Sequence, residues 1–307
     1  MDDLTVRFWG TRGSIPTPGR DTEKFGGNTT CIEVRYGDTL IVFDAGSGIR
    51  EMGISWMQEF SGESIEANLL FTHVYWDHIQ GFPFFGCAYQ PQNSLTIYGA
   101  ERPGGGMQRL LSGQMSGDWF PVPLTAMQAK MDFRTVTDEF TIGPVTIKPF
   151  PLPHPGGALG YRVEAGDSVF VLATDSELDQ VAANHDELKA DHFKPRQYSN
   201  ELLKFFRGAQ LLVVDCQYTD ELYKNCVGWG HNSLATVVDL CAQVQPGMLA
   251  LFHHDPQSSD EMVTRITDTV ARRLSARGER VLVFAAREGL TVKAQWPTPS
   301  PAPRGAS

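Results

Sequence analysis

The most informative segment of this chain reads Leu69-Leu70-Phe71-Thr72-His73-Val74-Tyr75-Trp76-Asp77-His78-Ile79-Gln80-Gly81. Its apolar start predicts a buried strand that ends at His73, and a short turn then leads to Asp77 and His78. A divalent metal needs such imidazole and carboxylate groups close together, because several lone pairs must converge at about 2.0–2.2 Å from the ion. One such residue alone would more often hydrogen-bond a turn, but three together favour a metal site.

Three further predicted strands each end next to a histidine or an aspartate. These residues are His154 after 145–150, Asp175 after 169–173 and His253 after 248–252. Ligands of layered α/β proteins bind at the ends of strands. Four strand ends that deliver His or Asp to one edge therefore predict a metal centre there.

Strands are predicted along most of the chain, and the helical signals are concentrated in its later part. Strands are predicted at 4–9, 31–36, 40–43, 69–72, 95–98, 145–150, 161–164, 169–173, 211–214, 248–252 and 281–284. A helical period follows Asn232 as N-cap, and Ser258 with Glu261 resembles a capping box before a second helix that ends at Gly278. Several strands are continuous apolar runs, so helices are expected on both faces of buried sheets, which makes the fold class α/β.

One domain is expected over residues 1–295. The segment 103–123, with three consecutive glycines and a short amphipathic piece, is predicted to be an insertion that could form a lid. Residues 296–307 hold four prolines and no apolar period, which predicts a disordered tail. The Gly- and Pro-rich stretch 10–19 is predicted to be a loop near a functional surface.

Composition excludes several classes of protein. The 307 residues carry 26 Lys+Arg against 36 Asp+Glu, and the net charge of −10 would repel phosphate backbones, so general nucleic-acid binding is not expected. No apolar run approaches the roughly 20 residues of a membrane span, and the acidic start is unlike an export signal. The five cysteines are odd in number and lack a CxxC pair. We therefore expect reduced core thiols in a cytoplasmic protein that does not bind membranes.

The segment from Thr72 to His78 resembles the HxHxDH motif of the metallo-β-lactamase superfamily, with Tyr75 at the second histidine position. The Gly-rich stretches 10–14 and 26–29, together with 228–233, resemble the RNase Z-like branch and its bacterial cyclic-nucleotide phosphodiesterases. The resemblance covers residues 4 to about 295. It implies a four-layer αββα sandwich with a dinuclear centre in the cleft between two sheets.

The resemblance also implies roles for individual residues. One metal would be held by His73, His154 and the residue at position 75, the other by Asp77, His78 and His253, with Asp175 bridging the two. His231 would protonate the leaving oxygen. The alternative is a structural histidine at the start of a helix, whose ring is hydrogen-bonded by the backbone. The expected catalytic residues are Asp77, His231 and Tyr75, and the expected cofactor is one or two Zn²⁺, with Fe or Mn as the alternative.

Tyr75 leaves three outcomes open for the first metal position. A phenol must lose a proton with a pKa of about 10 before it can bind as phenolate, and its oxygen lies farther from the backbone than an imidazole nitrogen does. The chain could hold one metal, it could hold two with Tyr75 as a phenolate or hydrogen-bonded to a bound water, or it could have lost hydrolysis. A phenolate suits ferric iron better than zinc, which is why iron remains an alternative.

The function expected from these features is metal-dependent hydrolysis. The substrate would be a cyclic nucleotide or a related small phosphodiester, attacked by a metal-activated hydroxide. Two alternatives are an iron or redox sensor without turnover and a hydrolase of lactones, thioesters or β-lactams. The family also implies a homodimer.

Substrate contacts are expected from Arg12 and from aromatic residues near the metal positions. Arg12 could pair with a phosphate. Four aromatic side chains, Phe84, Phe85, Trp119 and Phe120, could stack on a base. Aromatic residues flanked by proline are more often packing residues, so both roles remain open for these four.

Overall fold

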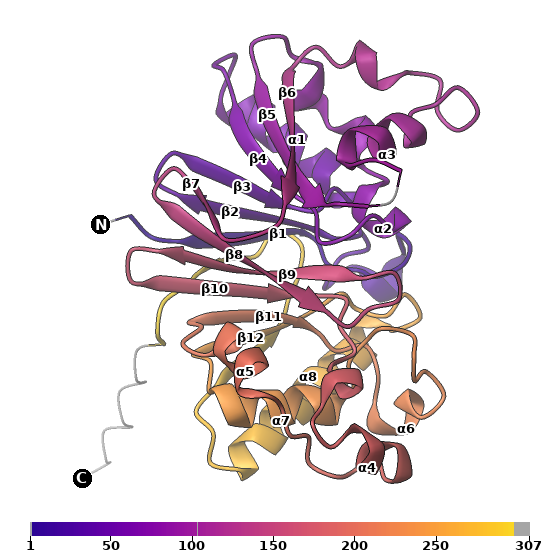
Figure 1. Ribbon diagram of the computed structural model, residues 1–307, viewed down its shortest axis with the longest axis vertical. Helices are drawn as coiled ribbons and strands as arrows, with labels where there is room; N and C mark the ends of the chain where they lie inside the picture. The colour runs from indigo at the N-terminus through magenta and orange to yellow at the C-terminus, as the bar shows by residue number, and fades with distance from the viewer. Residues whose placement is uncertain (1, 103, 298–307) are drawn as a thin grey trace.

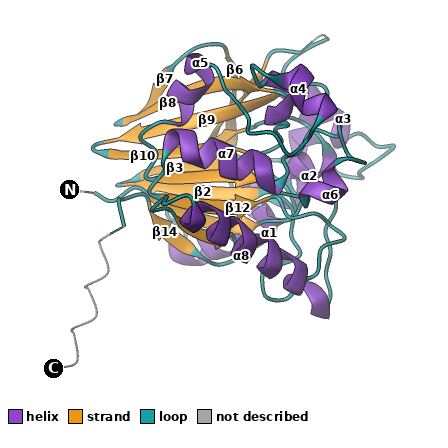
Figure 2. Cartoon of the chain, turned by 90° about the horizontal axis from the view of Figure 1, so that it is seen from below, coloured by secondary structure: helices purple, strands orange, loops and turns teal. Residues whose placement is uncertain are grey.

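Two β-sheets lie face to face in the centre of the molecule, and helices cover their outer faces (Figure 1). The protein is represented by a computed structural model that describes residues 2–102 and 104–297. Figure 2 shows α7 and α8 lying across the strands on one outer face. The four-layer αββα sandwich expected from the sequence is confirmed.

The first sheet has seven described strands in the order β14-β1-β2-β3-β4-β5-β6. They are β1 (Thr5–Gly10), β2 (Cys31–Tyr36), β3 (Thr39–Phe43), β4 (Glu66–Leu70), β5 (Ser94–Ala100), β6 (Lys130–Val136) and β14 (Thr291–Lys293). From β3 to β6 neighbouring strands are parallel. The helices of this half are α1 (Gly48–Glu59), α2 (Trp76–Ile79) and α3 (Met107–Gln114).

The second sheet also has seven described strands, in the order β13-β12-β11-β10-β9-β8-β7. They are β7 (Phe140–Ile142), β8 (Val145–Leu152), β9 (Ala158–Ala165), β10 (Ser168–Ala173), β11 (Leu211–Asp215), β12 (Met248–Phe252) and β13 (Leu282–Ala285). The helices of this half are α4 (His185–Ala190), α5 (Asn200–Phe206), α6 (Asp220–Tyr223), α7 (Leu234–Val244) and α8 (Asp260–Ala276). Strands β10 to β13 are parallel, and β8 points the same way because it is two antiparallel steps from β10.

The core has an inner layer between the sheets and an outer layer beneath the helices on each side. The inner layer joins residues of both sheets, such as Phe43 and Phe170, whose rings lie 6.0 Å apart. The outer layers pack α1 and α3 on the first sheet and α5, α7 and α8 on the second. Central strands such as β11 and β12 are buried on both faces, which explains their unbroken apolar sequences.

The strand ends meet at one edge of the sandwich, where the site is built. The loop after β4 carries His73, and the loops after β8, β10 and β12 carry the residues expected from the second sheet. The last strand residue before His73 is Leu70, so the predicted strand end at His73 was wrong by three residues. The loop 71–75 instead turns the chain into α2, which presents Asp77 and His78.

Several element boundaries differ from the prediction. The N-cap of α7 is Ser233 rather than Asn232, and the N-cap of α8 is Ser259 rather than Ser258, because these hydroxyls accept the amide hydrogen of the third residue on. Strands β6, β7 and β14 and helix α1 were not predicted. No helix among the described residues has both the length and the apolar character needed to cross a membrane. All five cysteines are buried and free, as expected.

The expected lid and tail lie partly outside the described residues. Within 104–123 the chain forms α3, and Gln114 at its end donates to the backbone oxygen of Ile79 at the end of α2. The segment therefore rests on the helix that carries Asp77, but a lid function stays a prediction. Position 103 and residues 298–307 are outside the described part of the chain.

Candidate metal centre

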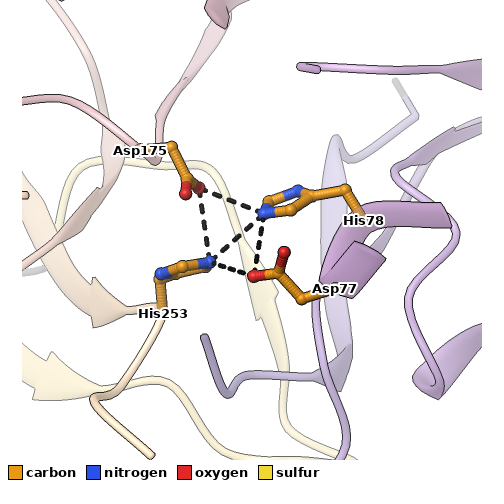
Figure 3. Close-up of side chains that lie close together, drawn as sticks. All are labelled: Asp77, His78, Asp175 and His253. Atoms are coloured by element: carbon orange, nitrogen blue, oxygen red, sulfur yellow. Dashed lines mark hydrogen bonds and ion pairs between the residues drawn. The ribbon is translucent and has the colours of Figure 1, made fainter. Parts of the chain in front are cut away.

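Two groups of metal-competent side chains meet at the strand ends and share one aspartate. The first group, Asp77, His78, Asp175 and His253, is called the four-donor position below, and Figure 3 shows its side chains converging. The second group, His73, His154 and Asp175, is called the three-donor position. The division is the one that the family resemblance implied, with Asp175 between the two positions.

The four-donor position has the size of a tetrahedral metal site. His253 Nε2 lies 3.1 Å from Asp77 Oδ2 and 3.2 Å from His78 Nε2. Asp175 Oδ2 lies 3.3 Å from His78 Nε2 and 3.4 Å from His253 Nε2, and His78 Nε2 is 3.4 Å from Asp77 Oδ2. A tetrahedron with metal–ligand bonds near 2.05 Å has edges of about 3.3 Å. These four atoms are therefore already spaced as ligands.

The three-donor position is wider and contains two unpaired nitrogens. Asp175 Oδ1 lies 3.9 Å from His73 Nε2 and 4.0 Å from His154 Nε2. Both nitrogens are buried and have no hydrogen-bond partner among the described residues. Because an unsatisfied buried polar atom is costly, two of them facing one carboxylate indicate a position that takes up a cation.

The electrostatics of the cluster also favour a cation. Burial would raise the pKa of Asp175, yet the neighbouring His253, His78 and His73 hold it well below the usual value. Burial opposes a charged His78, but Asp77, Asp175 and Asp44 raise its pKa well above the usual value. The buried carboxylates thus attract a positive charge, and a divalent metal can supply it in place of the proton on His78.

Hydrogen bonds behind the ligands fix which nitrogen faces inward. Asp44, at the end of β3, accepts a hydrogen bond from His78 Nδ1 at 2.8 Å, which leaves Nε2 for the metal. Asp44 is itself held by the backbone amide and the hydroxyl of Thr72, each at 2.8 Å. An acceptor such as Asp44 raises the basicity of the ligand and orients the ring. On the other histidine, Gln217 Nε2 lies 2.7 Å from His253 Nδ1, so the side-chain amide contacts the ring nitrogen that points away from Asp77 and Asp175.

Backbone strain is concentrated at the same edge. Among the described residues other than glycine, six have a positive φ, and four of these belong to the site: Ser14, Asp44, Asp175 and His253. Ser14 contributes its backbone amide, which donates to Asp77 Oδ2 at 2.7 Å. Left-handed backbone at non-glycine residues persists where surrounding contacts impose it, and it is frequent at functional sites.

His231 lies beside both metal positions. Its ring centroid is 5.5 Å from that of His154 and 5.2 Å from that of His253. Its Nδ1 lies 3.3 Å from Asp215 Oδ2, at the end of β11. Burial would lower the pKa of His231, but the hydrogen bond to Asp215 and the nearby acidic residues raise it overall. The imidazole is thus held ready to carry a proton.

Glu177 holds the loop that carries His231. Its carboxylate accepts hydrogen bonds from the backbone amides of Gly228 and Gly230 and from the hydroxyl of Tyr223. Neither Glu177 nor Asp44 nor Asp215 was singled out from the sequence. Asp44 and Asp215 carry the same signal as Asp175, because each follows a continuous apolar strand, and that criterion could have found them.

Tyr75 has a hydrogen-bond partner other than a metal. Its hydroxyl donates to the backbone oxygen of Pro155 at 2.6 Å. Its ring lies edge-on to His73, with centroids 4.8 Å apart, and the side chain is 42% exposed. Tyr75 contacts both histidines of the three-donor position, and its role as a ligand stays a prediction.

Two expected substrate contacts are buried instead. Arg12 has no exposed surface: its guanidinium donates to the backbone oxygens of Gly26, Asp255 and Ser258 and so ties three segments together. Phe85 is fully buried in the layer beneath α1. Neither side chain can reach a ligand without disrupting the core.

The remaining three aromatic side chains are accessible to differing degrees. Trp119 is 75% exposed and Phe84 is 57% exposed. Phe120 packs edge-on against Phe84 with ring centroids 5.5 Å apart. A stacking role for these three stays a prediction.

Comparison with known proteins finds relatives with the same fold. The family model of the β-lactamase superfamily domain matches residues 39–254. Ribonuclease BN of Cronobacter sakazakii is 25% identical over 170 residues, which are 53% of this chain and 50% of that protein. Ribonuclease Z of Thermococcus kodakarensis is 29% identical over 169 residues, 53% of this chain and 48% of that protein. These matches thus span about half the length of the two relatives.

A solved structure covers nearly the whole chain. The metallo-β-lactamase fold protein YhfI from Bacillus subtilis superimposes with a TM-score of 0.67 at 15% sequence identity, over 95% of this chain and 100% of that protein. At this identity the similarity establishes the fold.

Proposed function

The chain belongs to the β-lactamase superfamily, and on that basis we propose that it is a metal-dependent phosphodiesterase of small phosphodiesters, with cyclic nucleotides as the first substrates to test. The observation that carries the proposal is the placement of His231 beside two donor groups that share Asp175. Two adjoining metal positions suit displacement at phosphorus, where charge builds up on several oxygens at once.

The donor set fits a divalent metal, and each residue then has a defined task. Asp77, His78, Asp175 and His253 would hold one ion, and His73, His154 and Asp175 a second. Bound metal ions would supply Lewis-acid stabilisation of the phosphoryl oxygens and lower the pKa of water. His231 would give a proton to the departing oxygen, and Asp215 would keep its ring oriented and charged.

The names of the two curated relatives support phosphodiester chemistry, since both are ribonucleases. The net charge of −10 favours a small substrate over a folded RNA, because an RNA backbone would be repelled over a large contact surface. His231 and Asp215 are arranged to protonate a departing alkoxide oxygen, which supports a phosphodiester substrate over a β-lactam; a lactone also releases an alkoxide, and the substrate panel below distinguishes it. The iron-sensor alternative depends on Tyr75 as a ligand, and the bond from Tyr75 to Pro155 does not favour it.

A substrate panel tests the proposal. Protein loaded in turn with Zn²⁺, Mn²⁺ and Fe²⁺ would be assayed with 3′,5′- and 2′,3′-cyclic nucleotides, bis(p-nitrophenyl) phosphate, a homoserine lactone, a thioester and nitrocefin. We expect phosphodiester hydrolysis with at least one metal, its loss with excess chelator, and its loss in Asp175→Asn. Turnover of the acyl substrates without any phosphodiester turnover would refute the proposal.

A further inference from the structure

We propose that Tyr75 is not a metal ligand but a structural residue that bridges two loops, and that the two metal positions therefore differ in affinity. The four-donor position binds its ion tightly, and the three-donor position binds its ion weakly and exchanges it. The inference concerns metal binding alone, so it stands or falls independently of the proposed substrate. It rests on the number of donors, on their spacing and on the contacts of Tyr75.

The first argument is the donor set. The four-donor position offers two carboxylates and two imidazoles, whereas the three-donor position offers two imidazoles and shares its one carboxylate. The spacing differs as well. The donor–donor distances of 3.9 and 4.0 Å at the three-donor position exceed a tetrahedral edge by about 0.6 Å, whereas the distances given above for the four-donor position lie between 3.1 and 3.4 Å. A tetrahedral ion at the three-donor position therefore requires both imidazole nitrogens to move closer to Asp175.

The second argument is what Tyr75 does at this junction. It precedes α2 in the loop from the first sheet, and its hydroxyl reaches Pro155 in the loop from the second sheet. The ring also lies against His73 and His154, with centroids 4.8 and 5.4 Å away. One side chain thus bridges the two loops that carry the histidines of the three-donor position.

The loop around His154 is shaped to accept this bridge. Gly156 has a φ of +77°, and a β-carbon there would lie 2.9 Å from the Tyr75 hydroxyl oxygen. On the other side, His154 Nδ1 contacts the backbone oxygen of Gly230 at 3.1 Å, which leaves Nε2 directed at Asp175. Tyr75 and Gly230 therefore hold the His154 loop from two sides. The bond from Tyr75 to Pro155 positions His154 but adds no donor to the metal position.

Stepwise metal binding tests the inference. Protein stripped of metal would be titrated with Zn²⁺ by equilibrium dialysis and elemental analysis, and with Co²⁺ by visible absorption. We expect one ion to bind at least about 100-fold more tightly than the second. Tyr75→His should strengthen the second step about 10-fold or more, because it adds an imidazole donor. Tyr75→Phe should weaken that step about 10-fold, as the loss of a supporting hydrogen bond does in other metal sites.

A matched control is available in Tyr89, which belongs to neither donor group. Its hydroxyl also donates to the backbone oxygen of a proline, Pro83, at a distance of 2.8 Å. Tyr89→Phe should change neither step. In every variant the tight step also serves as the test of folding, since it needs loops from both sheets.

Three results would overturn the inference. Equal affinities in the wild type would do so, and so would a second step that Tyr75→Phe leaves unchanged. The third is a visible charge-transfer band in the Fe³⁺-loaded protein that Tyr75→Phe abolishes, because that band would identify Tyr75 as a phenolate ligand.

Discussion

His78 Nδ1 and Asp44 Oδ2 are joined by a 2.8 Å hydrogen bond between two completely buried side chains, and this bond selects the nitrogen that faces the four-donor position. We expect Asp44→Ala to weaken zinc binding at the tight position about 10- to 100-fold, because the ring loses its orientation and its acceptor. Competition with a zinc chelator measures the effect. Asp132→Ala, which removes an exposed carboxylate paired with Arg134, is the control, and equal affinities in the two variants would contradict the prediction.

Removal of metal should lower stability. The buried Asp77 and Asp175 lose their compensating cation, while the folded state alone presents the complete donor sets. Free Zn²⁺ at about 1,000 times its dissociation constant should add about 4 kcal/mol to the free energy of unfolding. Thermal melts with excess chelator and with added Zn²⁺ measure the difference, and His253→Ala should respond less than the wild type. A melting temperature that does not change when zinc is added would contradict the proposed metal centre.

The role of His231 should depend on the leaving group. If it protonates the departing oxygen, His231→Ala should lower kcat about 10²- to 10⁴-fold for a nucleoside leaving group. It should lower kcat much less for p-nitrophenolate, which departs without a proton. His185→Ala serves as a control because the ring nitrogen of His185 is satisfied by the backbone of Asp179. An equal loss for both leaving groups would point to a structural role.

A buried ion network behind the site should contribute strongly to stability. Arg196 makes two hydrogen bonds to Asp179, at 2.9 and 2.8 Å, and lies 3.6 Å from Asp239. Arg196→Leu removes the arginine partner of the buried Asp179 carboxylate, while Asp239 keeps its ion pair with Arg277, and the substitution should cost about 3–5 kcal/mol in urea unfolding. Arg265→Leu, which breaks an exposed pair with Glu261, should cost less than about 1 kcal/mol. If the two variants lost similar free energies of unfolding, the predicted difference between the buried and the exposed ion pair would be wrong.

Substitutions of the neighbours Phe84 and Phe85 should have different effects, because Phe85 packs in the core and Phe84 is largely exposed. Phe85→Ala opens a cavity in the core and should cost about 3–5 kcal/mol of stability. Phe84→Ala removes a largely exposed ring, so it should leave stability nearly unchanged. It should raise KM if Phe84 stacks on a base. Urea unfolding and steady-state kinetics on the two variants decide these points.

Much of the fold could be read from the sequence because buried strands leave a clear signal. Strands β2 and β12 have the predicted bounds: β2 alternates apolar and charged residues up to the Gly37-Asp38 turn, and β12 is an unbroken apolar run that ends at His253. Strand β6 was missed because its exposed face breaks the apolar run, as an edge strand permits. Helix α1 was missed because its glycines and charges dilute the apolar stripe that packs on the sheet.

The residues of the candidate site could be predicted from the sequence to a similar extent. Ligand candidates carry chemistry in their side chains and follow strands, so the sequence could group them. The contacts of Arg12 and Tyr75 depend instead on segments distant in the chain, such as Ser258 and Pro155. An arginine or a tyrosine near a site has many partners within reach, and the sequence does not say which one it takes.

The division of the donors between the sheets has a consequence for folding. His73, Asp77 and His78 come from the segment that ends with β6, whereas His154, Asp175 and His253 come from the segment that starts with β7. Neither segment holds a complete position, so an ion cannot bind fully until the two halves of the sandwich have docked. Tight metal binding therefore requires the docked state, and a bound ion stabilises that state against separation of the two halves.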